Sequence, residues 1–286
     1  MNATQPELRQ WIGRTESVSD VVTATPYAAL SATLDWPPER PAAGTPLPPL
    51  WHWLYFLPLY RQSDVGPDGH AKRGAFLPPV ALPRRMWAAS QFEFHLPLCI
   101  GDAITRTSTI ADVTEKSGRS GVLVFVKVRH EIRTQGVDAP AITEFHDIVY
   151  REAARPDAAA AEARAAPSRP AWERTIVPDD VLLFRYSALT FNGHRIHYDR
   201  RYVTEVEGYP GLIVHGPLLA TLLLDLLLRQ QPRASVTRFE FRAIQPLFDN
   251  APFAICGRPE PDGRDVALWA KDADGRLCME ATASIA

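Results

Sequence analysis

The chain has 286 residues, 46% of them hydrophobic and 22% charged, and a formal net charge of −2. This composition is typical of a globular protein, and the charge balance argues against a general nucleic-acid binder, whose footprint is a basic excess. The length allows two domains or one large one.

The cysteines and the apolar runs indicate the compartment. The chain has three cysteines, Cys99, Cys256 and Cys278, which lie far apart in the sequence. Because their number is odd and no two are close, we expect no disulfide framework and a reducing cytoplasm. The first eleven residues contain no apolar core of a secretory signal. The longest apolar run, 217–228, is shorter than the roughly 20 residues that a membrane span needs. We therefore expect a cytoplasmic protein that does not enter a membrane.

The first half of the chain begins with a predicted helix over 25–34. Thr25 and Pro26 supply its N-cap and first helical residue. Apolar and polar residues then alternate over 122–132, which predicts a strand, and 142–150 predicts another. One helix followed by antiparallel strands is the expected order in this half.

A long segment, 37–85, separates that helix from the strands. It is rich in proline and contains a group of large rings: Trp51, His52, Trp53, Tyr55, Phe56 and Tyr60. Long segments without regular structure are usually functional or disordered, and this one is too aromatic for disorder. We interpret it as an ordered flap that walls a pocket; the alternative is a packed excursion with no ligand role.

The composition changes over 151–174, where Ala, Arg and Pro dominate. The absence of a strand or helix period there indicates a linker. We therefore predict an N-terminal domain over 1–152, a linker over 153–174 and a C-terminal catalytic domain over 175–286.

The second half repeats the order of the first. A helix is predicted over 217–229, and strands are predicted over 236–244, 254–258, 266–271 and 277–285. The dipeptides Asp262-Gly263 and Asp274-Gly275 supply turns between the last strands. The common order predicts an internal duplication in architecture.

A dense polar cluster, 191–199, lies just before the second helix. An imidazole titrates near neutrality and moves protons in both directions, so His197 is the first candidate for that role and His194 the second. Asn192 is placed to orient a water or the imidazole. Asp199 holds the imidazole or caps a short helix. Taken singly, each histidine is more simply explained as a structural residue, and only the cluster favours catalysis.

The helix from Pro217 is apolar nearly all round, which predicts burial on most faces. Its first N–H groups are unpaired and carry partial positive charge, so they would stabilise a thioester or enolate oxygen. Histidine and aspartate are also metal ligands, but the spacing of His194, His197, Asp199 and His215 matches no zinc signature such as HExxH. We expect no metal.

Residues 185–199 resemble the hydratase motif of MaoC-like hot-dog proteins. The resemblance is strongest to the branch that contains type 2 3-hydroxyacyl-thioester dehydratases and the mesaconyl-C4-CoA and itaconyl-CoA hydratases. Residues 207–217 match that branch too, and 12–14 and 77–87 look like its N-terminal dehydratase-like domain. The resemblance implies an α+β double hot-dog, with two antiparallel sheets each wrapped around a central helix.

The same resemblance implies reversible addition of water to an enoyl-CoA thioester, with no cofactor beyond the CoA of the substrate. The wider family uses an Asp and a His five residues apart; here His197 occupies the His position and Asn192 the Asp position. His197 would act as base and acid, Asn192 would orient the water, and Gly216 with His215 would polarise the thioester carbonyl. Supporting roles fall to His194, Arg195, Tyr198 and Asp199.

The acyl group is open at this point. A short C5 dicarboxylyl-CoA needs a cation for its free carboxylate, with Arg84, Arg85 and Arg195 as candidates and Gly211 as a further substrate-binding residue. A fatty enoyl chain would instead need an apolar tunnel lined by the flap. A non-catalytic acyl-CoA-binding module and a thioesterase are the alternative functions. The sequence also leaves a homodimer open, and we expect neither a nucleic-acid partner nor a membrane.

Overall fold

The computed structural model describes residues 8–37, 40–72, 74–118, 121–152 and 163–286. Within these residues ten strands form one sheet in the order β1-β3-β4-β5-β2-β7-β10-β9-β8-β6, and every pairing is antiparallel. The first half contains β1 (Thr15–Val21), β2 (Arg84–Phe94), β3 (Ala103–Gly118), β4 (Gly121–Thr134) and β5 (Ile142–Arg151). The second contains β6 (Trp172–Ile176), β7 (Val236–Ala243), β8 (Phe253–Pro259), β9 (Asp265–Lys271) and β10 (Leu277–Ile285).

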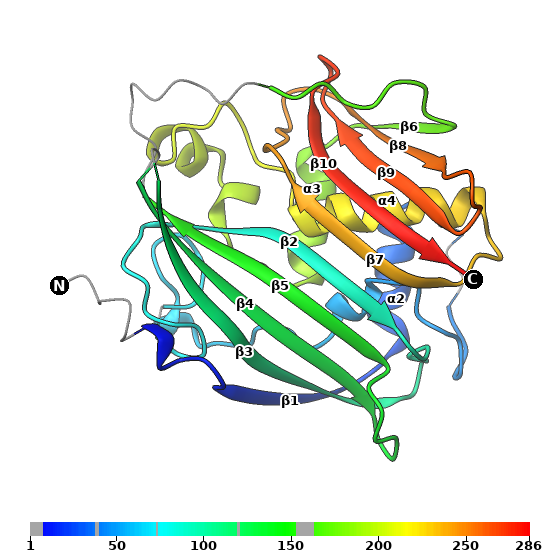
Figure 1. Ribbon diagram of the computed structural model, residues 1–286, viewed down its shortest axis with the longest axis horizontal. Coiled ribbons are helices and arrows are strands. Elements are labelled where there is room, and N and C mark those ends of the chain that lie inside the picture. Colours follow the sequence, from blue (N-terminus) through cyan, green and yellow to red (C-terminus); the bar gives the residue numbers. More distant parts are fainter. Residues whose placement is uncertain (1–7, 38–39, 73, 119–120, 153–162) are drawn as a thin grey trace.

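The two halves have the same topology. Counted within each half, both place their strands in the order first, third, fourth, fifth, second. The second strands, β2 and β7, meet at the centre and join the half-sheets (Figure 1). The predicted internal duplication and the double hot-dog architecture are therefore confirmed, with the two sheets forming halves of one continuous sheet.

The helices lie together on one face of this sheet (Figure 1). The α-helices are α2 (Ala24–Thr33), α3 (Asp180–Leu189) and α4 (Gly216–Gln230), and the short helices are η1 (Trp51–Leu54), η2 (Gln62–Asp64), η3 (Arg195–His197) and η4 (Tyr202–Val206). α4 is the longest, and none among the described residues is long and apolar enough to cross a membrane. The predicted helices match α2 and α4 to within one residue at each end.

Aromatic side chains seal the junction between the halves. Phe92 of β2 lies opposite Phe239 of β7, and the ring centroids are 5.9 Å apart. The ring of Phe241 lies 6.3 Å from that of Phe92. Beside them, Arg238 pairs with Glu93 across the same two strands at 3.1 Å. Backbone pairing and aromatic packing together fix how the first half sits against the second.

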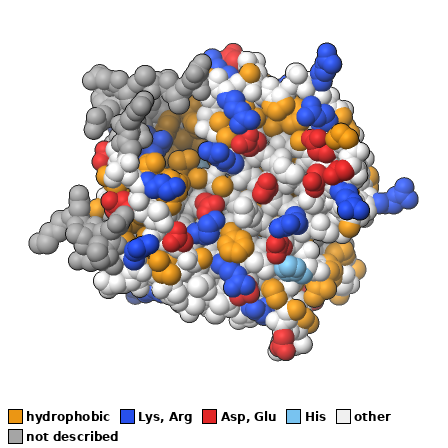
Figure 2. Space-filling model, viewed as in Figure 1, with side chains coloured by type: hydrophobic (Ala, Val, Ile, Leu, Met, Phe, Trp, Pro, Cys, Tyr) orange, Lys and Arg blue, Asp and Glu red, His pale blue; other side chains and the backbone are white. Residues whose placement is uncertain are grey.

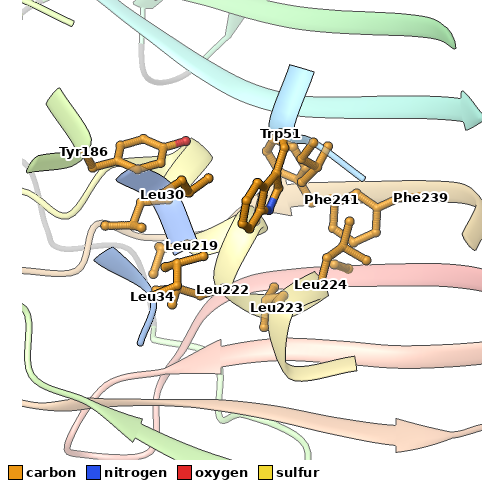
Figure 3. Close-up of a cluster of buried hydrophobic side chains, with 14 of the residues drawn as sticks. Leu30, Leu34, Trp51, Tyr186, Leu219, Leu222, Leu223, Leu224, Phe239 and Phe241 are labelled. Carbon is orange, nitrogen blue, oxygen red and sulfur yellow. The ribbon is translucent and has the colours of Figure 1, made fainter. Parts of the chain in front are cut away.

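The core is built around α4, whose residues from Leu218 to Leu227 are all buried. Each fully buried leucine stabilises the fold by roughly 2 kcal/mol. Figure 3 shows its leucines packed against α2, α3, η1 and β7, through Leu30, Leu34, Trp51, Tyr186, Leu219, Leu222, Leu223, Leu224, Phe239 and Phe241. The predicted burial of an all-apolar helix is confirmed, and the core it organises is shared by both halves.

The flap packs against the first half-sheet, where the second half has the long helix α4. η1 lies on β5, where the buried carboxylate of Glu144 accepts hydrogen bonds from His52 Nε2 and Trp53 Nε1, each at 2.9 Å, and from His146 Nε2. Burial alone would raise the pKa of Glu144, but His146 and His52 outweigh it and hold the pKa well below its usual range. A buried carboxylate with three donors thus anchors the flap.

The opposite face of the sheet is polar. Figure 2 shows acidic and basic side chains interspersed over it. Lys127 and Asp147, on neighbouring strands, form one of its ion pairs at 2.7 Å. Among the described residues of this face the two signs alternate closely and form no extended basic stripe.

The sequence analysis missed several elements. It did not predict β1, β2, β3, β6 or α3, and the last three residues of its linker, 172–174, belong to β6. Residues 153–162 of that linker lie outside the described residues. The division into two domains stays a prediction. All three cysteines are free, as expected.

Removal of the Glu144 carboxylate tests the flap anchor. Glu144→Ala leaves His52, Trp53 and His146 without their acceptor, so we expect the free energy of unfolding to fall by about 3 kcal/mol. Urea unfolding followed by circular dichroism measures this. Glu240→Ala, at an exposed position on β7, is the matched control, with a change expected below about 0.5 kcal/mol. Equal effects of the two variants would contradict the assignment.

Candidate active site

His197 is the most firmly oriented residue of the predicted cluster. It closes η3, its ring is buried, and its Nδ1 lies 2.7 Å from the carbonyl oxygen of Ile213. A carbonyl only accepts, so Nδ1 carries the hydrogen and the neutral ring keeps its lone pair on Nε2. The backbone bond from Ile213 N to Ile196 O, 3.0 Å, holds the two segments together. His197 is thus set up as a base through Nε2.

Four imidazoles form a continuous row. His215 stacks on His197 with centroids 3.8 Å apart, His194 contacts His197 edge-on at 5.4 Å, and His70 packs on His194 at 4.0 Å. His70 comes from the flap of the first half. The row therefore crosses from one half of the molecule to the other at the site.

Burial keeps the inner rings of this row neutral. It lowers the pKa of His197 to about 4, although the bond to Ile213 opposes the shift. Burial also lowers the pKa of His194 to about 2, with further lowering by His70 and His197, and it holds the pKa of His215 well below its usual range. Burial disfavours the charged form of these rings, and a nearby carboxylate or a hydrogen-bond acceptor favours it.

Asn192 lies at the end of α3, where the chain turns sharply. Phe191 adopts a left-handed conformation with φ of 49°, and Asn192 N donates to Ser187 O at 2.8 Å. The Oδ1 of Asn192 accepts from His194 N at 3.0 Å. The side chain thus holds the backbone of the motif as well as facing the pocket.

An open pocket of about 330 Å³ lies between the flap and α3. Its lining joins both halves: Tyr60, Gln62, Val65 and Gly69 from the flap, and Phe184, Ser187, Ala188, Phe191, Asn192, Gly193 and Tyr198 from the second half. Four residues of the predicted flap thus line a pocket, and the ligand role of the flap stays a prediction. Ser187 also bonds His215 Nε2 at 2.8 Å, so the pocket leads toward the row of rings.

The start of α4 follows His215 directly. His215 is its N-cap, and no atom other than its neighbours lies within 4 Å of the position where a side chain on Gly216 would begin. The first N–H groups of α4 carry partial positive charge, and the space beside Gly216 is open to a carbonyl oxygen. A carbonyl oxygen therefore fits beside Gly216, as its predicted oxyanion role requires.

The supporting residues of the motif bind one another. The guanidinium of Arg195 donates to Asp199 Oδ2 from Nη2 at 2.8 Å and from Nε at 3.0 Å, and Tyr202 N donates to Asp199 Oδ1 at 3.0 Å. Tyr198 OH donates to Gly193 O at 2.9 Å. Of the two roles considered for Asp199, it takes the capping one, because Ile213 O rather than a carboxylate holds the His197 ring.

The structure separates the predicted substrate-binding residues. Arg84 donates to Tyr209 OH at 3.2 Å and pairs with Glu207 at 3.7 Å. Gly211 is buried, and a side chain there would meet Asp249 at 2.6 Å. Arg85 forms no ion pair or side-chain hydrogen bond with another described residue. It lies near His194, whose pKa is lowered mainly by burial and further by Arg85.

Two residues of the site were missed by the sequence analysis. Asp68 and His70 lie in a turn of the flap, with His70 Nδ1 3.0 Å from Asp68 Oδ2. The Gly-Pro-Asp-Gly-His run at 66–70 was the available signal, since a turn places an Asp beside a His two residues on. Ligand atoms of Asp68, His70 and His194 lie within 4.8 Å of one another, a donor set that fits a divalent metal.

Comparison with known proteins shows the family and the fold of the chain. The family model described as hydroxyacyl-thioester dehydratase type 2 matches residues 50–249. A mesaconyl-C(4)-CoA hydratase of Chloroflexus aurantiacus is 48% identical over 96% of both chains. Among solved structures, HtdX of Mycobacterium tuberculosis has a TM-score of 0.67 at 19% identity, covering 94% of this chain and 99% of its own. A second protein of that organism, described as a double hot-dog, has a TM-score of 0.57 at 13% identity over 96% of both chains.

The neutral histidines predict how stability depends on pH. The folded pKa values of His130, His194, His197 and His215 are lowered, so the unfolded chain binds protons that the folded chain does not. This stability is fully present above about pH 6.5 and falls below it by roughly 1.4 kcal/mol per pH unit for each histidine. For His197 the loss continues until the pH reaches its folded pKa of about 4. Urea unfolding at pH 7, 6 and 5 measures the slope. His197→Gln should flatten it by about one histidine; an unchanged slope contradicts the assignment.

Proposed function

Because this chain belongs to the hydroxyacyl-thioester dehydratase type 2 family, we propose that it hydrates a short dicarboxylyl-CoA of the mesaconyl-C4-CoA type, reversibly and through His197. The chain is a hydro-lyase that acts on enoyl- and 3-hydroxyacyl-thioesters. The specific acyl group and the residue roles are the proposal.

One observation carries the residue roles, namely the bond that fixes the His197 ring beside the start of α4. Nε2 of His197 takes a proton from water as the hydroxyl oxygen adds to the β-carbon of the thioester. The electron pair of the double bond moves onto the thioester oxygen, which Gly216 N–H and the helix dipole stabilise. A proton then reaches the α-carbon and completes the hydration.

The 48% identical relative suggests the acyl group. In a mesaconyl-C4 thioester the free carboxylate is attached to the carbon that takes up the hydroxyl group. A cation that binds it must therefore lie beside the proton-transfer groups and not at the far end of a tunnel. We assign this role to Arg85, whose charge acts on two groups of the site. It adds to the lowering of the pKa of His194 by burial, and it opposes the raising of the pKa of Tyr60 by burial.

The other arginine candidates are engaged elsewhere. The guanidinium of Arg84 is bound to Tyr209 and Glu207, and that of Arg195 to Asp199 and the flap. A cation without a protein partner binds a substrate carboxylate without first giving up an ion pair. This difference supports Arg85 as the carboxylate-binding residue. The cytoplasmic location and the independence from cofactors stay predictions.

Replacement of His197 tests the base. His197→Ala should lower kcat for hydration of mesaconyl-C4-CoA by at least about 100-fold, the usual scale for a general acid–base group. The decrease in enoyl-thioester absorbance measures hydration, and the melting temperature checks that the variant is folded. Near-normal turnover would contradict the assignment. Tight binding of CoA esters without turnover by the unaltered chain would favour a non-catalytic module, and release of CoA thiol would favour a thioesterase.

Replacement of Arg85 tests the acyl group. Arg85→Met should lower kcat/KM for mesaconyl-C4-CoA by at least about tenfold and leave that for crotonyl-CoA nearly unchanged, because crotonyl-CoA has no free carboxylate to lose a partner. Arg84→Met is the comparison and should not change the ratio of the two substrates. A preference of the unaltered chain for crotonyl-CoA would instead favour a dehydratase of fatty-acyl type.

A further inference from the structure

We propose that His70, held by Asp68, is a second catalytic residue of this site and delivers the proton to the α-carbon. The inference rests on the proposed hydration reaction and extends it, because it places an acid of the first half into a site whose base belongs to the second half. Four observations support it. The turn of the flap is hydrogen-bonded to the motif, it packs closely against it, a carboxylate orients the His70 ring, and the other polar residues of the motif are less suited to act as the acid.

The turn at 66–70 is tied to the catalytic motif through the backbone. Its own shape is fixed by the bond from Gly66 N to His70 O at 2.7 Å. Arg195 N donates to Asp68 O at 2.9 Å, and the Arg195 guanidinium donates to Pro67 O at 3.0 Å. The turn and η3 therefore form one hydrogen-bonded unit, although they are more than 120 residues apart in the chain. His70 is placed at the site by these contacts.

Two glycines allow this close approach. A side chain on Gly69 would begin 1.8 Å from Gly193 O, and the φ of Gly69 is 90°. Tyr60 OH donates to Gly69 O at 3.2 Å from the other side. Any larger residue at Gly69 would push the turn away from the motif. The packing thus determines the position of His70 relative to His194 and His197.

The His70 ring is oriented by a carboxylate. Nδ1 lies 3.0 Å from Asp68 Oδ2, and the backbone N of His70 donates to Asp68 Oδ1 at 3.1 Å. The bond from His70 holds the pKa of Asp68 well below its usual range, so the carboxylate is ionised at neutral pH. An ionised carboxylate fixes the hydrogen on Nδ1 and stabilises the positively charged ring. His70 is therefore equipped to give up a proton from Nε2.

Asn192, His194 and His215 are poorly suited to act as the acid. Asn192 has no ionisable group, and its Oδ1 accepts from His194 N. His194 and His215 are kept neutral by burial, and His215 Nε2 is bonded to Ser187. Hydration takes a proton from water and gives one to carbon, and either one imidazole does both in turn or two groups share the transfers. The carboxylate of Asp68 favours the charged form of the His70 ring, which supports the Asp68–His70 pair as a separate acid beside His197.

Every proton taken up or released in the proposed hydration is accounted for. His197 Nε2 accepts one proton from water, and the remaining hydroxide forms the C–O bond at the β-carbon. The double-bond electrons pass to the thioester oxygen, then return to form the α-C–H bond as His70 Nε2 releases its proton. The substrate has gained one water. His197 then loses its extra proton to solvent and His70 regains one, so both are reset for the next turnover.

The test measures two steps with the same variants. His70→Ala and His70→Gln should each lower kcat for hydration by at least about 100-fold, with KM changed by less than about threefold. Both should also lose exchange of the α-hydrogen of the 3-hydroxyacyl-CoA product with D₂O. Added imidazole should raise the rate of His70→Ala by at least about tenfold, because the shortened side chain leaves space for it. It should not raise the rate of His70→Gln. Asp68→Asn should show a smaller loss in the same direction.

The controls separate catalysis from folding and from metal binding. His95→Ala changes a histidine of the same half that bonds Thr143 away from the site, and its rates should stay unchanged. Melting temperatures identify misfolded variants. We expect no effect of chelators; a loss on chelation that Zn²⁺ restores would replace this proposal with a metal site on Asp68, His70 and His194.

The outcomes distinguish this proposal from the proposed function. If the unaltered chain hydrates an ester of the panel and His70→Gln retains full kcat, His70 is not the acid while the function stands. The role of His70 is also overturned if its variants change KM alone, or if His70→Ala still exchanges the α-hydrogen at the full rate. If the unaltered chain hydrates neither mesaconyl-C4-CoA nor crotonyl-CoA, both proposals fall.

Discussion

The pairing of β2 with β7 is the contact on which the rest of the structure depends. Each half-sheet would otherwise end in a strand with unpaired N–H and C=O groups, and the pairing satisfies them while Phe92, Phe239 and Phe241 become buried. It also fixes the first half at one angle and register against the second. The flap that leads into β2 is thereby carried to the catalytic motif, and a site assembled from both halves becomes possible.

The two halves share a topology but differ in what covers their sheets. The second half has the 15-residue α4, whose start supplies polarised N–H groups, while the first half has the 10-residue α2 and the flap. The flap covers its half-sheet at the cost of burying the charge of Glu144, which three donors offset. In return the first half can contribute a turn and an arginine that a second long helix would exclude.

Burial sets the chemistry of the site. Neutral, stacked imidazoles are good proton acceptors only where a partner fixes the tautomer, as Ile213 O does for His197. A negative neighbour favours the protonated form of an imidazole, and His70 is hydrogen-bonded to one, the carboxylate of Asp68. The hydrogen-bond partners therefore distinguish chemically identical rings, and Asn192 holds the backbone of the motif by accepting from His194 N.

The sequence by itself determined the elements whose signal is local. Alternation predicted β4, the all-apolar run predicted α4, and the resemblance of 185–199 to a hydratase motif singled out Asn192 and His197. Short or interrupted patterns such as β1, β3 and α3 were missed, although Asp179 caps α3 as a cap residue should. Only the tertiary structure decided that His70 packs on His194, that Ile213 orients His197 and that Arg84 is bound to Tyr209 and Glu207. These choices depend on contacts between residues far apart in the chain, and no local pattern encodes such distances.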